Sequence, residues 1–264
     1  MTDEAAISPA FEGAVDTHCH LFLLEEGPAP AVAAAWEAGV GRMVCVGIDP
    51  ESSRRSLELA ESFRGVFASA GVHPHTASEF DRAAGVVIEE LLADPLVVAV
   101  GETGLDYYRR LSPVEDQQQA FRTHIALSRE TDKPLVVHVR EAWDDAMRIL
   151  EEEEAERVVL HCFSGDAAAA GEAGRRGYFT SFAGNLTYPN AAPLRGAAAA
   201  AAAGRILIET DSPFLAPQHV RGSANSPANV VSVAAELAEI RGVSLEEMLA
   251  RTTAASREAF PLLR

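Results

Sequence analysis

The amino-acid sequence predicts an α/β fold, a (β/α)8 barrel in a single domain. Short apolar, β-branched runs alternate with longer helical stretches along the whole chain, the pattern of repeated β-then-α units. Eight such runs in 264 residues match the size of a (β/α)8 barrel. The runs are almost continuously apolar, as strands of a parallel sheet covered on both faces must be. No linker or break in composition interrupts them, so we expect one domain over residues 1–264.

Eight segments are predicted as strands, and the helical stretches between them connect parallel neighbours. They are Ala14–Thr17, Arg42–Gly47, Val66–Gly71, Leu96–Gly101, Leu135–Val139, Val158–Cys162, Tyr178–Phe182 and Arg205–Glu209. Among the connections, Ser112–Thr131 has apolar residues near helical spacing. The alanine runs Ala167–Ala170 and Ala197–Ala203 fall where outer helices are due, and alanine is the best helix former, so we expect helices there.

The end of the chain is predicted to hold a long connection followed by two closing helices. The connection, residues 210–227, is rich in proline and glycine and is expected to lie over one barrel mouth. Ser226-Pro227 resembles an N-cap with proline in the first turn, and Ser244-x-x-Glu247 resembles a capping box.

The charge balance limits the partners of the protein. Its 22 basic and 39 acidic residues give a net charge of −17, which argues against a broad cationic surface for nucleic acid or anionic membrane. An anionic substrate must then be held locally, by metal ions or a few arginines. No stretch approaches the roughly 18 apolar residues of a membrane span, and the acidic start Met1–Glu4 is unlike a signal peptide. We therefore expect a cytoplasmic protein, with no obligate protein partner evident.

The three cysteines do not predict a disulfide framework or a zinc ribbon. Cys19, Cys45 and Cys162 are odd in number and form no C-x-x-C pair. We expect buried free thiols. Within the stretch Val15–Leu21, alternation along a strand places His18 and His20 on one face and Cys19 on the other. Two imidazoles on one face suit a cation, whereas a cysteine nucleophile needs its base on its own side. Packing or surface histidines remain the alternative at this point.

Candidate ligands gather at the carboxyl ends of the predicted strands, where the active site of a (β/α)8 barrel is built. They are His18 and His20 after the first strand, Glu102 after the fourth, His138 in the fifth, His161 in the sixth and Asp211 after the eighth. Four imidazoles and two carboxylates exceed what one cation usually takes, so two metal ions fit better. Glu102 is the natural bridge, and Asp211 can accept the proton of an attacking water.

These residues lie in motifs that resemble the TatD family of metal-dependent deoxyribonucleases, in the family's order and almost end to end. The motifs are Asp16–His20 (DTHCH), Gly71–His75 (GVHPH), Gly101–Tyr108 (GETGLDYY), Lys133–His138 (KPLVVH), His161–Gly165 (HCFSG) and Glu209–Leu215 (ETDSPFL). The resemblance implies a TIM-type barrel, two divalent cations and hydrolysis of DNA phosphodiesters, often from a 3′ end. It assigns His18, His20, Glu102 and Asp211 to one metal and Glu102, His138 and His161 to the other.

Other residues are weaker candidates, each with a structural alternative. His73 is similar to a family histidine near the substrate phosphate, with a structural role as the alternative. For His75 the sequence does not favour a functional role over a structural one. Arg140 lies on the same face as His138, where it can hold a phosphate or pair with a neighbouring loop. Further positions can order loops or, for the tyrosines, stack on a base, but the simpler interpretation is ordinary loop polarity or, for the tyrosines, packing or loop anchoring. They are Asp106, Tyr107, Tyr108, Arg221 and Asn225.

Three other functions remain open at the level of sequence. A two-metal amidohydrolase bridged by a carbamylated lysine is disfavoured, because the only lysine, Lys133, starts the fifth strand at the opposite mouth. A mononuclear deaminase would leave Glu102 without a metal role. A binding protein that has kept the barrel would have no reason to keep every ligand position. We expect zinc in the isolated protein, with manganese or magnesium supporting activity, and single-stranded DNA or 3′ ends as the substrate.

Overall fold

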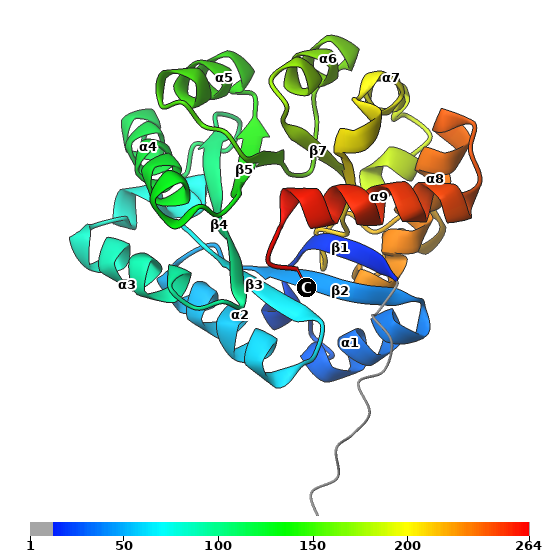
Figure 1. Ribbon diagram of the computed structural model, residues 1–264, viewed down its shortest axis with the longest axis horizontal. Coiled ribbons are helices and arrows are strands. Elements are labelled where there is room, and N and C mark those ends of the chain that lie inside the picture. Colours follow the sequence, from blue (N-terminus) through cyan, green and yellow to red (C-terminus); the bar gives the residue numbers. More distant parts are fainter. Residues whose placement is uncertain (1–12, 264) are drawn as a thin grey trace, which may run out of the picture.

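The fold of this protein, described by a computed structural model over residues 13–263, is a barrel of parallel strands inside a ring of helices (Figure 1). The strands, in their order around the sheet, are β1 (Ala14–Cys19), β2 (Val40–Val46), β3 (Val66–Ala70), β4 (Val97–Asp106), β5 (Leu135–Arg140), β6 (Val158–Leu160), β7 (Phe179–Phe182) and β8 (Ile206–Ile208). The helices are α1 (Pro28–Glu37), α2 (Pro50–Ser62), α3 (Arg82–Leu92), α4 (Val114–Thr131), α5 (Trp143–Glu152), α6 (Ala167–Arg175), α7 (Ala192–Ala200), α8 (Val230–Arg241) and α9 (Leu245–Ala259).

The barrel closes between β1 and the residues after β8. The backbone N–H of Asp211 donates to the His18 carbonyl at 2.8 Å, and that of His20 donates to the Ser212 carbonyl at 2.8 Å. Cys19 and Ser212 form an isolated parallel bridge. The prediction of a single (β/α)8, TIM-type domain is therefore confirmed for the described residues, whereas residues 1–12 and 264 lie outside them.

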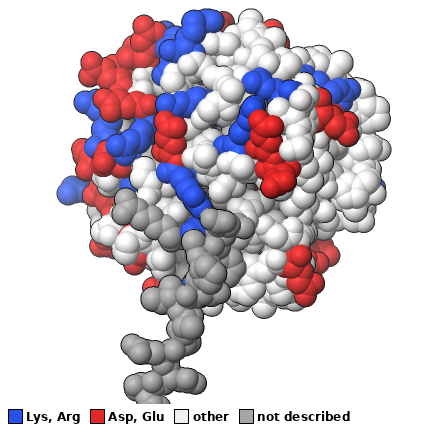
Figure 2. Space-filling view, turned by 45° about the vertical axis from the view of Figure 1, so that its right-hand side comes forward, with Lys and Arg blue, Asp and Glu red and all other residues white. Residues whose placement is uncertain are grey.

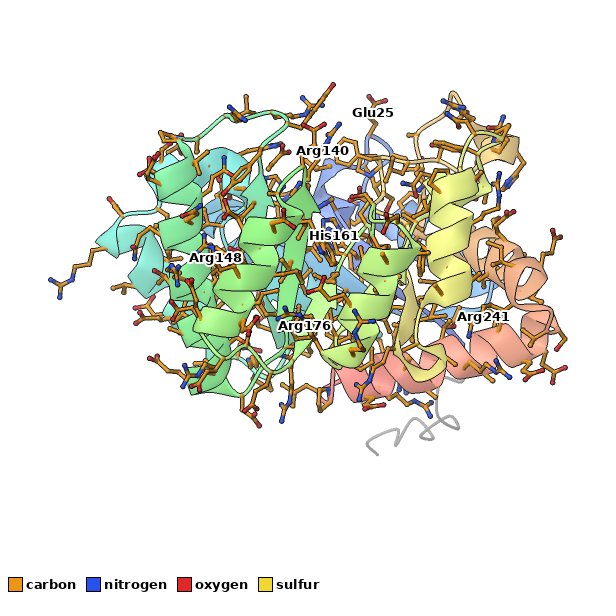
Figure 3. All side chains as sticks on the ribbon, turned by 90° about the horizontal axis from the view of Figure 1, so that it is seen from above. Glu25, Arg140, Arg148, His161, Arg176 and Arg241 are labelled. Atoms are coloured by element: carbon orange, nitrogen blue, oxygen red, sulfur yellow. The ribbon has the colours of Figure 1, made fainter. Side chains whose placement is uncertain are left out.

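Two apolar layers hold the barrel together. Inside it, one residue or more from each strand packs with Phe260 and Leu263, which follow α9. Helix α9 crosses the N-terminal mouth, at the bottom of Figure 3. A second and larger layer fills the space between the strands and the outer helices. Apolar side chains thus close the N-terminal mouth of the barrel, whereas the C-terminal mouth is open to polar side chains.

The predicted strands and helices are present, with differences at their ends. β4 runs on to Asp106 because it keeps pairing with β5 as far as Arg140, so Glu102 lies inside this strand rather than after it. α7 ends at Ala200, before the end of the alanine run, because the Arg241 guanidinium binds the carbonyls of the helix end, Ala199 among them at 2.7 Å.

The two predicted closing helices are α8 and α9, and their caps differ from the prediction. Ser226 precedes a short 3-10 turn that leads into α8, and its side chain makes no capping hydrogen bond. The Ser244 hydroxyl accepts from the backbone N–H of Glu247 at 3.1 Å, which is one half of a capping box.

The cysteines are free, as predicted, but only two of them are buried. Cys19 lies in the layer between barrel and helices and donates to the Val44 carbonyl at 3.4 Å, Cys45 is buried, and Cys162 is partly exposed. No helix among residues 13–263 has the length and apolarity needed to cross a bilayer. Met1–Glu4, on which the expectation about a signal peptide rests, lies outside the described residues.

Candidate metal centre

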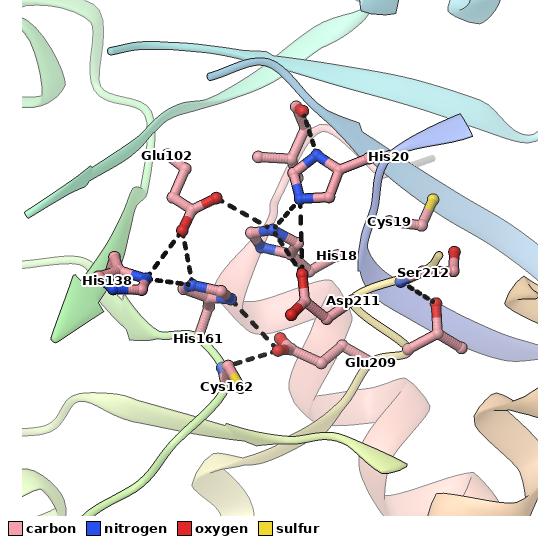
Figure 4. Close-up of polar contacts among 12 residues, drawn as sticks. His18, Cys19, His20, Glu102, His138, His161, Cys162, Glu209, Asp211 and Ser212 are labelled. Carbon is pink, nitrogen blue, oxygen red and sulfur yellow. Dashed lines mark hydrogen bonds and ion pairs between the residues drawn. The ribbon is translucent and has the colours of Figure 1, made fainter. Parts of the chain in front are cut away.

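The six predicted ligands meet at the C-terminal mouth of the barrel, where their side chains converge (Figure 4). In β5, and directly after β6, which ends at Leu160 rather than at the predicted Cys162, plain alternation places them there. Val136 and Val159 point into the barrel core, and His138 and His161 follow two residues later on the same face. The inward-facing side chains change from apolar to polar at the same level in both strands. A layer of polar side chains therefore lies on the C-terminal side of the apolar barrel core.

Strand β1 needs a break in this alternation. Val15 points into the barrel, and His18, three residues later, points inward as well. A register shift between Asp16 and Cys19 supplies the change of phase. After it, His18 and His20 share the inner face and Cys19 lies on the outer one, as predicted.

One set of side chains surrounds the Nε2 atom of His18. This nitrogen lies 3.3 Å from His20 Nε2, 3.3 Å from Glu102 Oε2 and 3.8 Å from Asp211 Oδ1. Asp211 Oδ1 is also 3.5 Å from His20 Nε2. Two imidazole nitrogens and two carboxylates thus converge within the reach of a single cation.

A second set surrounds the other oxygen of Glu102. Oε1 lies 2.8 Å from His161 Nε2, 3.1 Å from His138 Nδ1 and 3.3 Å from His73 Nε2. The nitrogens of His138 and His161 are 3.3 Å apart. The Glu102 carboxylate therefore lies between two clusters and presents one oxygen to each.

In three of the histidines, the ring nitrogen that points away from the clusters faces an acceptor oxygen. The other nitrogen of each ring therefore points into a cluster. His20 Nδ1 donates to the Val46 carbonyl at 2.9 Å, and His161 Nδ1 donates to Glu209 Oε1 at 3.3 Å. His138 Nε2 faces the Asp106 carboxylate at 3.4 Å. A neutral imidazole that donates through one nitrogen presents a lone pair on the other, so the lone pairs of His20 and His161 point into the clusters. His138 Nε2 makes no hydrogen bond to Asp106, and its Nδ1 is the nitrogen that faces Glu102. This donor set fits divalent cations.

His73 has the opposite arrangement. Its Nδ1 accepts from the backbone N–H of His75 at 3.1 Å, so in the neutral ring the proton is on Nε2, which faces Glu102. Burial lowers the pKa of His73 to about 4, which keeps the ring neutral near pH 7. His73 therefore presents a hydrogen-bond donor to the centre rather than a lone pair.

The electrostatics of the centre favour positive charge. Burial raises the pKa of the Glu102 carboxyl, but His161, His73 and His138 lower it by more, to well below its ordinary value. The pKa of His18, by contrast, is lowered by burial and by the neighbouring His161 ring. The Glu102 carboxylate thus stays ionised among imidazole rings that cannot all be protonated together. A bound metal cation would supply the positive charge that this carboxylate favours.

The weaker candidates lie around this centre. Arg140 is exposed at the rim, and the contact that the structure gives its guanidinium is the face of Tyr108, with Cζ 4.0 Å from the ring centroid. His75 Nε2 contacts Asp106 Oδ2 at 2.8 Å. The other oxygen of Asp106 accepts from the backbone of the loop after β4, including Arg109 N at 2.8 Å, so this carboxylate orders that loop.

Three further candidates make structural contacts. The Tyr107 hydroxyl donates to Asp145 at 2.8 Å, which anchors its loop. The Asn225 amide donates to the Thr210 carbonyl at 2.8 Å and so ties the long connection to the end of β8. Arg221 lies over the ring of Tyr188, with Cζ 4.3 Å from the centroid.

Glu209 and Asp16 were missed as site residues by the sequence reasoning. Glu209 is fully buried and holds both His161 and the backbone N–H of Cys162, the latter at 2.7 Å. Alternation along β8 carries the signal, because Glu209 lies two residues after the inward-facing Leu207. Asp16 is buried and accepts from the Thr210 hydroxyl at 2.6 Å, which joins β1 to the residues after β8.

The only lysine cannot bridge the two clusters. Lys133 precedes β5 at the N-terminal end of the barrel, where its ammonium donates to the carbonyls of Asp94, at 3.0 Å, and Val97. A bridge of carbamylated lysine is therefore excluded by its position.

Comparisons with known proteins agree with this architecture. A family model described as TatD related DNase matches residues 15–261. The uncharacterized metal-dependent hydrolase YabD of Bacillus subtilis is 37% identical over 253 residues, which cover 93% of this chain and 98% of YabD. The 3′-5′ ssDNA/RNA exonuclease TatD of Klebsiella pneumoniae is 34% identical over 236 residues, which cover 87% of this chain and 90% of that protein.

Solved structures give the same result. The TatD homologue YjjV of Escherichia coli superposes with a TM-score of 0.89 at 28% identity, covering 95% of this chain and 99% of YjjV. A TatD family hydrolase of Entamoeba histolytica superposes at 0.81 with 20% identity, over 94% of this chain and 98% of its own, and supports the fold alone. On the match over residues 15–261, this chain belongs to the TatD-related DNase family of metal-dependent hydrolases.

Proposed function

We propose that this protein hydrolyses phosphodiester bonds of DNA from single-stranded 3′ ends, with two divalent cations. The observation that carries the proposal is the position of Glu102, whose two oxygens face two separate sets of donors. The exonuclease name of the Klebsiella relative supports the choice of substrate. A mononuclear deaminase would give Glu102 no such double role.

In this proposal His18, His20, Glu102 and Asp211 hold one cation, and Glu102, His138 and His161 hold the other. We expect zinc in the isolated protein and activity with manganese or magnesium. When bound, the two cations supply the positive charge that activates a water and neutralises charge on the phosphate.

The side chains of the protein supply the remaining chemistry. Burial raises the pKa of Asp211, but His20, His18 and His161 lower it by more, so this carboxylate is ionised and can accept the proton of the attacking water. The Nε2–H of His73 is a donor for a phosphate oxygen, and Arg140 at the rim adds a cationic contact. The cytoplasmic location remains a prediction.

Labelled single strands test this function. DNA and RNA strands with free or blocked 3′ ends would be incubated with protein stripped by EDTA and then resupplied with zinc, manganese or magnesium. We expect cleavage of free 3′ ends only after a metal is added. Equal rates on blocked and free ends would refute the 3′-exonuclease mode, and no cleavage of any strand would refute the function.

A further inference from the structure

One side of the C-terminal mouth, beside β1 and β8, is apolar and acidic. The first arginine or lysine of the chain is Arg42, so the loop after β1 has no cationic side chain, but Glu25 and Glu26 are exposed in it. Leu23 of the same loop is 40% exposed, and Phe214 after β8 is 52% exposed. The arginine of the connection after β8, Arg221, lies over the Tyr188 ring. Beside Leu23 and Phe214 a phosphodiester backbone therefore meets apolar side chains and is repelled by the two carboxylates.

The opposite side, beside β4 and β5, is cationic. The loop after β4 exposes Arg109 and Arg110, and Arg140 at the end of β5 stacks on the exposed ring of Tyr108. Figure 3 shows Arg140 and Glu25 at the same end of the barrel. Glu141 and Asp144, which follow Arg140 in the chain, are the exposed carboxylates nearest to it in sequence, and the loop from Tyr107 to Leu111 has no acidic side chain. On the face of the molecule that Figure 2 draws, basic and acidic side chains lie close to one another. In a chain of net charge −17, the arginines beside β4 and β5 are a local site of attraction for phosphates.

A cavity adjoins the cationic side. It has a volume of about 340 Å³, near the lower end for ligand pockets. Val139 and Glu141, the two neighbours of Arg140, line it together with His161, Trp143 and Phe163. Its lining is mixed, with the rings of Trp143 and Phe163 beside the carboxylates of Glu141 and Asp166. Aromatic walls beside a guanidinium suit the base of a nucleotide whose phosphate the guanidinium binds.

The backbone at Phe214 and at the preceding Pro213 is hydrogen-bonded, although the Phe214 ring is exposed. Its backbone N–H donates to the Asp211 carbonyl at 2.9 Å, and Asn225 N–H braces Pro213 at 2.9 Å. The ring centroid lies 6.2 Å from that of His20, at an interplanar angle of 69°. An apolar ring presented to solvent beside the candidate ligands is a surface on which a flat base can stack.

From this asymmetry we infer the direction of the bound strand, an inference that rests on the proposed function. The 3′-terminal base stacks on Phe214, on the side of β1 and β8. The phosphates of the remaining strand run over Arg140 and Tyr108, on the side of β4 and β5. The terminal nucleotide has a single phosphodiester link, at the metal centre, so it needs no further cationic contact.

The test compares three substrates in the metal-loaded protein: a ten-nucleotide single strand, a dinucleotide, and the ten-nucleotide strand with an abasic 3′ residue. Arg140→Ala is expected to lower kcat/KM on the long strand about tenfold and on the dinucleotide much less. The salt dependence on the long strand is expected to fall by a slope of about 0.7, as for one lost phosphate contact. Arg148→Ala removes the same charge from the outer face of α5 and is the matched control.

Phe214→Ala is expected to lower kcat/KM roughly tenfold on both strands that end in a base, and to leave the abasic strand unchanged. Phe214→Trp should retain activity, and Phe214→Leu keeps apolar volume without a ring if the alanine variant does not fold. Val86→Ala, another exposed apolar position, is the control.

Several outcomes would overturn the inference while the proposed function stands. They are an equal loss for Arg140→Ala on long and short substrates, a Phe214→Ala loss that persists on the abasic strand, and a length-dependent loss for Arg221→Ala in place of Arg140→Ala. The last would place the strand beside Tyr188 instead. A wild-type protein that cleaves none of the substrates would overturn the proposed function itself.

Discussion

Two buried histidines, His124 in α4 and His161 after β6, show what distinguishes a structural imidazole from a candidate ligand. His124 Nδ1 donates to the Ala120 carbonyl at 2.7 Å, and its Nε2 accepts from Val72 N at 3.0 Å. Each nitrogen of that ring has one partner of the right kind. His161 Nε2 instead faces a carboxylate and another imidazole, at 2.8 and 3.3 Å. Burial is common to both, and only the second leaves lone pairs converging on one point.

The difference also appears in charge. Burial lowers the pKa of His124 to about 4, so the ring is simply neutral in the folded protein. Burial lowers the pKa of His161 too, but Glu102 and Glu209 raise it by more, to well above its ordinary value. The first site is complete without a ligand, whereas the second demands a positive charge. Substitutions at the metal centre and at His124 test that contrast.

The largest effect is expected at Glu102, which both clusters share. Glu102→Gln keeps the shape of the side chain and removes its charge, so we expect a loss of several kcal/mol of transition-state stabilisation, roughly 10³-fold in kcat. Metal content should fall below two ions per chain. Steady-state kinetics and elemental analysis measure the two effects, with Glu130→Gln on the exposed face of α4 as control. An undiminished rate with one metal would favour a mononuclear enzyme.

A smaller loss is expected at Asp211. Asp211→Asn keeps an oxygen donor but removes the proton acceptor, so we expect retained metal with kcat lowered roughly 10²-fold or more. Kinetics of the metal-loaded variant check this. Wild-type turnover would remove Asp211 from its role as general base.

Glu209 is a positioning residue in this account, because it acts through His161. Glu209→Gln weakens the acceptor for His161 Nδ1, and we expect metal affinity or activity to fall about 10- to 100-fold. Metal titration gives the affinity, and the unfolding midpoint of the metal-free protein reports stability separately. A variant that loses stability but binds metal with unchanged affinity would make Glu209 purely structural.

The smallest effect on activity, and none on metal content, is expected at His124. Its pKa of about 4 lies below the ordinary 6.5, so the unfolded chain binds the additional proton between these values. The stability that the buried neutral ring of His124 gives is fully present above pH 6.5 and is lost as the pH falls towards 4. The total loss in the free energy of unfolding is about 3 kcal/mol. Denaturant unfolding of the metal-free wild type and of His124→Gln measures the difference in their free energies of unfolding. We expect this difference to shrink by up to about 1.4 kcal/mol for each unit by which the pH falls between 6.5 and 4. A difference independent of pH would contradict the burial of a neutral ring.

Much of the fold follows from local pattern. Apolar runs and helical spacing predict the eight strands and α4 because each strand is covered on both faces, so its residues are uniformly apolar. The ends of elements depend on distant contacts. β4 continues because β5 pairs with it as far as Arg140. α7 ends where the Arg241 guanidinium, from α8, donates hydrogen bonds to the carbonyls at the end of that helix.

The candidate ligands were predictable as a group because the carboxyl ends of parallel strands meet at one mouth. Local pattern did not divide them between two metals, and that assignment came from the family resemblance, since the distances from Glu102 to His18 and to His161 depend on the closed barrel. Glu209 was missed although it shares a face with Asp211. The donor role of His73 depends on a backbone N–H two residues away, which only the folded loop provides.

The need for two cations is tested most directly by adding metal stepwise to EDTA-stripped wild-type protein and following the cleavage of a single strand with a free 3′ end. We expect no cleavage by the stripped protein and full activity only when two equivalents of metal per chain are bound. Full activity at one equivalent, or cleavage that survives removal of the metal, would contradict it.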